Sequence, residues 1–562
     1  MACLEEGIQL RKGGIRGEIL ILGYTPPSQV PLLRRYKLTQ TAVDFSHAVQ
    51  LSQAGKSLPV HLAVDTGMHR LGEPCHHLEE IVQIFTMKHL RVEGIFTHLC
   101  TADSPSPADR AYVQRQVQAF QQLLAIMAAT LVVPVITNGA TGSTLSPAAA
   151  LFGAGVGTLV YLLFTKFRSP VFLGSSFAFL GSMAAAFAGG VSMTLGYAGL
   201  ILGAVFAGFV YVIIAAAVKV AGVKWLDRLM PVVVIGPTVS IIGLSLAGNA
   251  VSDLVKGSVV NAEGAAVASP LITVLCGLVA LLVTMLCSTY GKKMVRLIPF
   301  ILGILAGYAV AAVFTLIGNA TATDALKVLD FSKLSVLWEN GVTLKTFVNY
   351  ELVTKDFVFL KAAKGFAELN WGYVGAIAVA YVPVAFVVFA EHIADHKNIS
   401  SIIGKDLLKD PGLSRTLLGD GVGSMAGALL GGCPNTTYGE SVACVAITRN
   451  ASVVTILATA ILAMLVSFFS PFVAFVNSIP SCVMGGVCIA LYGFIAVSGL
   501  KMIQQVDLGK DNNLFVVSTI LVTGIGGLSL TFGKITITPV AVALILGILA
   551  NQILKGRSAN RD

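Results

Sequence analysis

The sequence predicts a mainly α-helical membrane protein that begins with a smaller α/β segment. Of the 562 residues, 55% are hydrophobic and 12% are charged, whereas soluble domains carry about 25% charged residues. The mean hydropathy is +0.81, and apolar runs of about 20 residues, the length that crosses a bilayer, recur from residue 117 onward. Most of the chain is therefore expected to lie in lipid, while the residues before 117 form a different class of segment.

Short β-prone runs alternate with helical patterns in the first part of the chain. The β-prone runs are Glu18–Tyr24, Leu58–Asp65 and Val92–His98, and the helical patterns cover Ala42–Ala54 and His77–Met87. Strands that alternate with helices are typical of βα units on a parallel sheet. We therefore predict two domains, an α/β segment over residues 1–116 and a membrane domain over residues 117–562.

Three stretches of the first segment resemble alanine racemases, in particular the serine/alanine racemases linked to membranes. They are Ile21–Pro27, Val64–Gly72 and Gly94–Asp103. The resemblance implies a pyridoxal-phosphate-binding (β/α)₈ barrel in which Arg70 and His98 line the cofactor. It covers only a middle slice of that enzyme, without the Schiff-base lysine or the catalytic tyrosine, and a closed barrel needs about 250 residues. A partial TIM barrel without racemase activity is expected, and a gene model that joins two unrelated genes is the other explanation.

From residue 117 onward, twelve apolar segments are each predicted as one membrane helix. They lie near 117–137, 146–164, 195–218, 229–247, 268–288, 295–317, 371–392, 414–432, 452–475, 480–500, 513–530 and 536–554. Two further segments, 173–190 and 433–449, are apolar but interrupted by hydroxyl, glycine and amide residues. Together they predict about 14 passes, two of them broken.

Basic residues alternate between the predicted sides of the membrane, so the net charge of +9 reflects topology rather than binding to nucleic acid. With the N-terminus in the cytoplasm, the clusters at 166–168, 219–228, 292–296, 397–415 and 501–510 all fall inside. The outside loops near 138–145, 190–195 and 475–479 contain no Lys or Arg, and the long outside loop Asn319–Asn370 has a balanced charge. The positive-inside rule therefore predicts that both termini are cytoplasmic.

The membrane domain contains an internal repeat. Pro231–Gly236 and Pro480–Gly485 each open a helix with the same spacing between proline and glycine, and the interrupted segments Gly174–Phe179 and Asn435–Glu440 correspond in the same way. With seven spans in each half, the second half must be inverted relative to the first. Interrupted helices in corresponding places predict a binding site between the two repeats.

The polar stretch Gly432–Glu440 is the strongest candidate site, because it stands where a membrane helix would be expected to continue. Non-helical backbone at this depth is tolerated where it lines a cavity, and a carboxylate there is expected to be functional. Ser175–Phe179 and Ala390–His396 are the other candidate stretches. Free N–H groups of two half-helices, together with two carboxylates, would suit a flat, neutral, polar heterocycle whose face an aromatic ring covers.

Five segments of the membrane domain resemble the uracil permeases of the nucleobase–ascorbate transporter family. They are Leu173–Phe179, Ala390–Ile393, Lys405–Leu413, Pro434–Glu440 and Ala446–Arg449. The resemblance covers about residue 120 to the C-terminus. It implies 14 segments in two inverted seven-segment repeats, divided into a core and a gate domain. It also implies import of uracil by proton symport across a bacterial cytoplasmic membrane.

The resemblance also implies a set of substrate-binding residues, namely Phe177, Glu391, Tyr438, Gly439, Glu440 and Tyr492. The two glutamates would hydrogen-bond the base, and the backbone amides of Phe177 and Gly439 would meet its carbonyl groups. Some relatives carry a histidine where this chain has Asp395, with His396 next to it. The proton carrier therefore stays open among Glu391, Asp395, their pair and Glu440. Asp395 and His396 themselves are expected to be interfacial rather than catalytic.

Other functions and roles are weighed against this one. A carrier of xanthine or another purine is the first alternative, although that branch typically has a Gln-Asn pair where this chain has Gly439–Glu440. A racemase anchored in the membrane is a second, and Glu440 could instead only cap its half-helix. The expected partners are uracil, a proton and membrane lipid, with a homodimer as a candidate assembly. No nucleic acid or cofactor is expected. No metal is expected either, because the nine cysteines are scattered singly.

Overall fold

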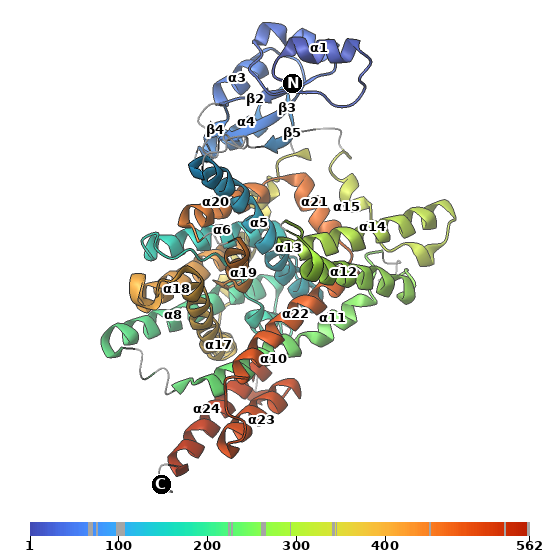
Figure 1. Cartoon of the computed structure of the whole chain (residues 1–562). Coiled ribbons are helices and arrows are strands. Elements are labelled where there is room, and N and C mark those ends of the chain that lie inside the picture. Colours follow the sequence, from blue (N-terminus) through green and yellow to red (C-terminus); the bar gives the residue numbers. More distant parts are fainter. Residues whose placement is uncertain are drawn as a thin grey trace. The chain divides into compact units, whose positions relative to one another are not determined.

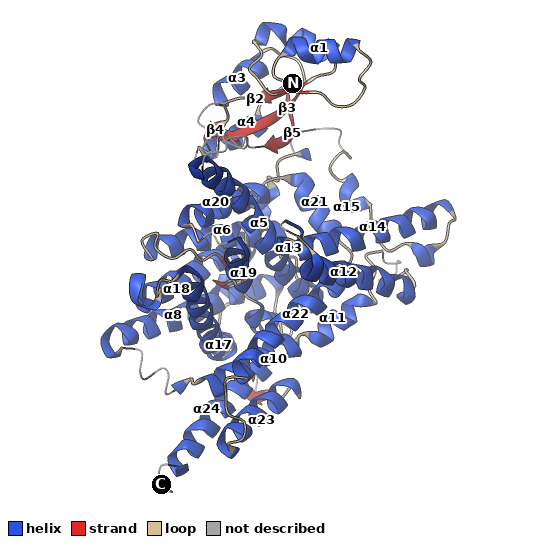
Figure 2. Ribbon diagram, in the orientation of Figure 1, coloured by secondary structure: helices blue, strands red, loops and turns tan. Residues whose placement is uncertain are grey.

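The chain forms two compact units in the computed structural model (Figures 1 and 2). The structure describes residues 1–65, 71–74, 77–96, 107–222, 225, 229–259, 266–292, 294–339, 343, 346–448, 451–532 and 535–558. The smaller unit contains Met1–Gln118, Ser335–Tyr350 and Phe468–Phe472. The larger unit contains Ala119–Leu334, Glu351–Ser467 and Val473–Asp562. The division into domains at residue 116 stays a prediction.

A parallel sheet forms the centre of the smaller unit, as the alternation of strands and helices predicts. Its strands are β1 (Leu20–Ile21), β2 (Thr39–Ala42), β3 (Leu58–Asp65), β4 (Glu73–Pro74) and β5 (Leu90–Phe96). They follow the order β1-β2-β3-β4, with β5 also paired to β3, and every pairing is parallel. The helices between them are α1 (Leu4–Lys12), α2 (Val30–Arg35), α3 (Phe45–Gln53) and α4 (Leu78–Thr86).

The sheet of the smaller unit has an apolar core and is an open α/β layer. Leu58, Val60 and Leu62 alternate along β3 and are fully buried, because alternate residues of a strand point to the same face. Asp44 caps the start of helix α3, because its Oδ1 accepts a hydrogen bond from the backbone N–H of His47 at 2.6 Å. Five strands are present among the described residues, fewer than the eight of a TIM barrel. The candidate residues Arg70 and His98 lie outside the described residues.

The larger unit is helical, and among the described residues eight helices are long and apolar enough to cross a membrane. They are residues 117–141 of α5 (Pro107–Thr141), α6 (Pro147–Phe164), α8 (Met193–Ala221), Val232–Leu254 (α10, Val232–Ser245, and α11, Ala247–Leu254), α12 (Pro270–Tyr290), α14 (Pro299–Ala320), α17 (Trp371–Ile403) and α22 (Ser481–Ile503). The other principal helices are α7 (Leu180–Ala186), α18 (Leu413–Gly431), α19 (Gly439–Thr448), α20 (Val453–Ser467), α21 (Ser470–Ser478), α23 (Asp511–Ile525) and α24 (Pro539–Ser558). The count of 14 passes stays a prediction.

The span predicted over residues 452–475 is interrupted in the structure. The single helix predicted over residues 452–475 is divided into α20, which ends at Ser467, and α21, which begins at Ser470. Pro471 explains the break, because proline removes a backbone donor and disfavours helical geometry in the residue before it. Such a residue fits the first turn of the new helix α21 but not the interior of a continuous one.

The two interrupted segments each form a short strand followed by a half-helix. In the first, β6 (Leu173–Ser175) is followed by a 3₁₀ turn and α7, and in the second β7 (Asn435–Thr437) is followed by α19. The strands pair antiparallel, with Gly174 opposite Thr436, which is the relation that inverted halves of the chain produce. The broken helices predicted from the polar interruptions are thus present, and the pairing satisfies backbone groups that lipid could not.

The repeated proline–glycine motifs also take equivalent places. Pro231 and Pro480 are the residues immediately before α10 and α22, and both have extended backbone angles. The two helices pack against each other, and Ser240 of α10 donates a hydrogen bond to the carbonyl of Ala496 on α22 at 3.1 Å. Helices from the two halves of the sequence therefore pack side by side, and the proline of each motif stands at the N-terminal end of its helix.

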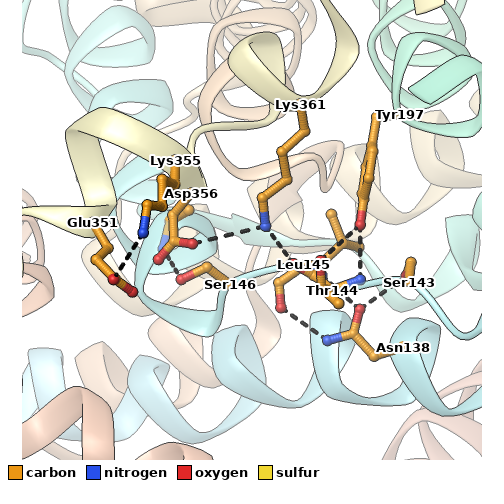
Figure 3. Close-up of polar contacts among 11 residues, drawn as sticks. Asn138, Ser143, Thr144, Leu145, Ser146, Tyr197, Glu351, Lys355, Asp356 and Lys361 are labelled. Atoms are coloured by element: carbon orange, nitrogen blue, oxygen red, sulfur yellow. Dashed lines mark hydrogen bonds and ion pairs between the residues drawn. The ribbon is translucent and has the colours of Figure 1, made fainter. Parts of the chain in front are cut away.

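The loop between α5 and α6 is fixed by polar contacts with two distant segments (Figure 3). Asn138 accepts a hydrogen bond from the N–H of Leu145 at 2.7 Å and donates one to the Leu145 carbonyl at 2.8 Å. The N–H of Thr144 donates to the Tyr197 hydroxyl at 2.7 Å, and Lys361 donates to the Thr144 carbonyl. Lys361 belongs to the long loop Asn319–Asn370, and it contacts the loop near 138–145. Both loops are predicted to lie outside, so two loops assigned to the same side meet.

Two further contacts also join loops that the charge pattern assigns to a common side. On the predicted outer side, Ser192 donates a hydrogen bond to Glu368 at 2.5 Å, and this bond lowers the pKa of the Glu368 carboxyl. On the predicted inner side, hydrogen bonds from Lys405 and Arg168, at 2.8 and 3.0 Å, lower the pKa of Asp410. The alternation of loops in the sequence agrees with these spatial neighbours.

Candidate ligand site at the two broken segments

The strand pair is held between helices α6 and α18 by the side chain of Asn435. Its Nδ2 donates a hydrogen bond to the carbonyl of Gly153 at 3.1 Å. Gly153 and Gly157 on α6 face Gly423 and Gly427 on α18 so closely that any side chain atom at these glycines would meet backbone. This close approach is typical of small-residue packing between membrane helices. Asn435 therefore bonds the backbone of α6, and the glycine pairs fix its position.

Open space lies at the start of α19, directly after β7. Gly439 is exposed and Glu440 is half-buried, although Tyr438 before them and Ser441 after them are buried. A side-chain carbon placed on Gly439 would have one atom within reach, Oδ1 of Asp395 at 4.0 Å. The N-terminal end of this half-helix therefore faces an unfilled space, and its backbone N–H groups are available to a ligand.

Three predicted carboxylates gather beside this space. Glu391 and Asp395 stand one turn apart on α17, which packs against both β7 and α19. Glu391 lies close enough to Asp395 and Glu440 for their charges to interact. The structure thus brings together the two glutamates that the sequence separates by 49 positions, and it adds Asp395 to the same group.

Asp395 has a partner on the broken segment itself. The hydroxyl of Thr437, the last residue of β7, donates a hydrogen bond to Asp395 Oδ2 at 2.8 Å. The Thr437 hydroxyl thus bonds a side-chain carboxylate rather than the broken backbone. The interfacial role expected for Asp395 and His396 stays a prediction. Their side chains are buried, at 8% and 0% exposed, on helix α17, which continues to Ile403, past the predicted end at residue 392.

The predicted aromatic residues lie at two different parts of the site. Phe177 follows β6, and its ring contacts that of Tyr492 on α22 edge to face, with centroids 5.9 Å apart. Tyr438 lies behind the strand pair, where its hydroxyl donates to the Ser175 carbonyl at 3.0 Å and its ring covers Gly174. Phe177 and Tyr492 thus join α22 to the broken segment, whereas Tyr438 braces the strands. Roles of all three in binding stay predictions.

A polar network that the sequence did not predict lies beside the carboxylates of α17, on the adjacent part of the helix surface. His392 Nδ1 lies 2.6 Å from Asp420 Oδ2 on α18, and both side chains are buried. His396 Nε2 lies 2.7 Å from the hydroxyl of Tyr161 on α6. Two histidines and an aspartate within apolar runs were the available signal, because such residues are costly in membrane helices and are expected to pair.

Comparison with known proteins identifies the membrane part of the chain. The model of the Permease family matches residues 114–532, three quarters of the sequence. The chain belongs to this permease family. The resemblance inferred from the five segments is thereby confirmed, and the permease is a multi-pass membrane protein of bacterial type.

Several relatives of the permease have names that state a substrate. It is 37% identical to the uracil permease of Bacillus caldolyticus over 444 residues, which is 78% of this chain and 91% of that protein. It is 34% identical to the uracil permease of Bacillus subtilis (strain 168), with coverage of 78% and 91%. It is 33% identical to the uracil permease of Escherichia coli (strain K12), with coverage of 78% and 90%.

The comparisons also find the racemase-like segment and one membrane structure. The model of the alanine racemase N-terminal domain matches residues 1–164, overlapping the permease match. An alanine racemase from Clostridium difficile 630 is 32% identical over 20% of this chain with a TM-score of 0.19, and the permease spans 31% of its length. The transmembrane domain of the cyanobacterial bicarbonate transporter BicA is 13% identical, with coverage of 78% and 97% and a TM-score of 0.47.

Proposed function

We propose that this permease imports uracil across a bacterial cytoplasmic membrane together with protons, and that uracil binds in the space at the start of α19. The observation that carries the proposal is the meeting of Glu440, at the first turn of α19, with Glu391 of α17 beside the open position at Gly439. The names of the relatives supply the substrate, since all three reported above are uracil permeases.

The chemistry of the space suits the edges of a uracil ring. Uracil is flat and neutral, with two N–H donors and two carbonyl acceptors. Carboxylates of Glu391 and Glu440 accept from the N–H groups, while the backbone N–H groups of Gly439 and Phe177 donate to the carbonyls. Charge-assisted hydrogen bonds of this kind are roughly twice as strong as neutral ones. The ring of Phe177, held by Tyr492, covers one face of the base.

We propose that the proton resides among Glu391, Asp395 and Glu440. Three carboxylates so close together cannot all stay ionised at low cost, because like charges favour protonation of one of them. Thr437 donates to Asp395 from the strand that leads directly to Gly439 and Glu440. The charge on Asp395 is thereby connected to the backbone at the ligand position, which gives proton binding a route to uracil occupancy. We also propose that both termini lie in the cytoplasm, which the charge pattern supports.

Competition for uptake tests this function. Labelled uracil uptake is measured in cells that lack their own uracil carrier, with thymine, xanthine or uric acid in excess, at an acidic and an alkaline external pH. Unlabelled uracil should compete fully, xanthine and uric acid should not compete, and uptake should be greater at the acidic pH because an inward proton gradient drives symport. Competition by xanthine equal to that by uracil would favour a purine carrier, and uptake that is independent of pH would rule out proton symport.

We propose that the racemase-like segment, residues 1–116, is not an enzyme. The sheet of the described residues supports this, because it has five strands whereas a TIM barrel has eight. The purified permease mixed with pyridoxal phosphate should therefore show no absorbance band of an internal Schiff base and no racemisation of L-alanine or L-serine. An alanine racemase serves as the positive control, and appearance of the band together with turnover would contradict the proposal.

A further inference from the structure

Two stacked histidines on α17 form a hydrogen-bonded network that the proposed ligand site does not use. The rings of His392 and His396 lie 4.0 Å apart between centroids and 27° from parallel. Both side chains are completely buried, and each of their four ring nitrogens has a partner. The partners are Asp420 and Thr416 for His392, and the His392 carbonyl and Tyr161 for His396.

The hydrogen bonds around the His392–Asp420 pair allow it to bind one additional proton. His392 Nε2 lies 3.0 Å from Thr416 Oγ1, which in turn lies 3.0 Å from the carbonyl of Leu413. Thr416 has a single hydroxyl hydrogen. When that hydrogen points to His392, the pair holds one proton and is anionic. When it points to Leu413, Nε2 carries its own proton and donates to Thr416, so the pair holds two protons and is neutral.

The same count applies to the second ring. His396 Nδ1 lies 2.8 Å from the His392 carbonyl and therefore carries a proton, since a carbonyl can only accept. His396 Nε2 shares the Tyr161 hydroxyl with Ser169, which lies 2.7 Å from that hydroxyl. When the Tyr161 hydroxyl points to His396, Nε2 accepts its hydrogen and is not protonated. When the hydroxyl points to Ser169, Nε2 carries its own proton and donates to Tyr161. Each ring can thus gain a proton by rotation of one hydroxyl, with all its hydrogen bonds kept.

We propose that this histidine network, centred on His392 and Asp420, is a second proton-binding site of the permease, separate from the carboxylates at the ligand space. The proton taken up forms an N–H bond at His392 Nε2, Thr416 turns its hydroxyl to Leu413, and the His392–Asp420 pair changes from anionic to neutral. The inference rests on the proposed proton symport for its use in transport, but the binding of a proton to the network does not depend on uracil.

The network can influence the ligand site through its charge. The Asp420 carboxylate lies within electrostatic range of both Glu391 and Asp395. Neutralising the His392–Asp420 pair removes a negative charge from behind these carboxylates and favours their ionised, uracil-binding forms. The titratable groups that face the network are on four helices: Glu391, Asp395 and His396 on α17, Asp420 on α18, Tyr161 on α6 and Tyr211 on α8.

Nitrogen NMR tests proton binding directly. The permease is labelled with ¹⁵N-histidine in detergent micelles, and the His392 signals are assigned from their loss in His392→Gln. Over about pH 5 to 9, His392 should pass between a form with one protonated ring nitrogen and a form with both protonated or sharing a proton with Asp420. A single neutral form at every pH, with and without uracil, would overturn the proposal.

Asp420→Asn tests the use of the site in transport. The amide keeps the shape but carries no charge, so the pair can no longer change from an anionic to a neutral form by taking up a proton. In proteoliposomes, exchange of labelled for unlabelled uracil without a pH gradient should stay close to that of the unmodified permease. Accumulation driven by a pH gradient should fall by about 5- to 150-fold, the usual range of a coupling between sites.

Controls separate this role from structure and from the proposed function. Thr459→Val removes a buried hydroxyl that bonds backbone carbonyls of α20 and α5 among the described residues, and it should change neither assay. An equal loss of exchange and accumulation in Asp420→Asn would mean a structural role and would contradict the use in transport. Should the unmodified permease fail to exchange uracil, the proposed function fails, while the NMR titration still decides whether the network binds a proton.

Discussion

Replacing Glu440 with glutamine is expected to abolish concentrative uracil uptake while the protein still inserts and folds. The side chain at the first turn of α19 is half-buried beside the open position at Gly439, so the change leaves the helix packing intact. A hydrogen bond to a charged group is worth about 1.5–3 kcal/mol, so loss of the carboxylate should weaken uracil binding roughly 10- to 150-fold. Loss of a titratable group close to Glu391 should also disturb proton coupling.

The measurement combines binding with folding. Uracil binding to the purified variant is followed by its effect on the thermal unfolding midpoint, since a ligand that binds only the folded state raises that midpoint. Glu351→Gln is the matched control, because Glu351 is an exposed glutamate that forms an ion pair with Lys355 at 3.2 Å. It should bind uracil as the unmodified protein does. Normal uptake by Glu440→Gln would remove Glu440 from the site and with it the main support for the proposed function.

Replacing Gly157 with alanine is expected to destabilise the membrane domain and disable transport. A methyl group there would lie 2.5 Å from Asn435 Nδ2 and 2.7 Å from the carbonyl of Gly423. Helices α6 and α18 would have to separate, and overpacking of this kind costs about 1–3 kcal/mol. Asn435 would lose its position against Gly153, so the strand pair next to the ligand space would shift as well.

The thermal unfolding midpoint in detergent and the yield of monodisperse protein measure this effect. Gly375→Ala is the control, because Gly375 lies on α17 with nothing within 4 Å of the position of its added carbon. Alanine there should leave the midpoint unchanged or raise it slightly, since alanine favours helices over glycine. An unchanged midpoint for Gly157→Ala would mean that the close approach of α6 and α18 does not limit stability.

Much of the fold could be predicted because lipid imposes simple rules on the sequence. Apolar runs of about 20 residues become helices, and polar interruptions become broken segments. The break at Gly432–Glu440 was visible for this reason, and β7 and α19 follow it. The division between α20 and α21 was not predicted, because a single proline in an apolar run has a small effect on hydropathy. Its effect is on backbone geometry instead.

The sequence predicted the site residues that stand out within their own segment, but not the contacts between residues of different segments. The carboxylates of Glu391 and Glu440 each stand out within their own apolar surroundings. The contact between Thr437 and Asp395 and the pairing of His392 with Asp420 join residues 42 and 28 positions apart. No local pattern determines which faces of α17 meet the neighbouring elements, so these partners depend on tertiary packing.

The pairing of β6 with β7 has a consequence for how the protein is made. Leu173–Ser175 is synthesised long before its partner strand Asn435–Thr437. Until then its backbone groups have no strand to bond with, and hydrocarbon offers them no substitute. The first half of the permease must therefore wait in the translocation machinery or at the membrane surface, and neither half can reach its final form when expressed alone.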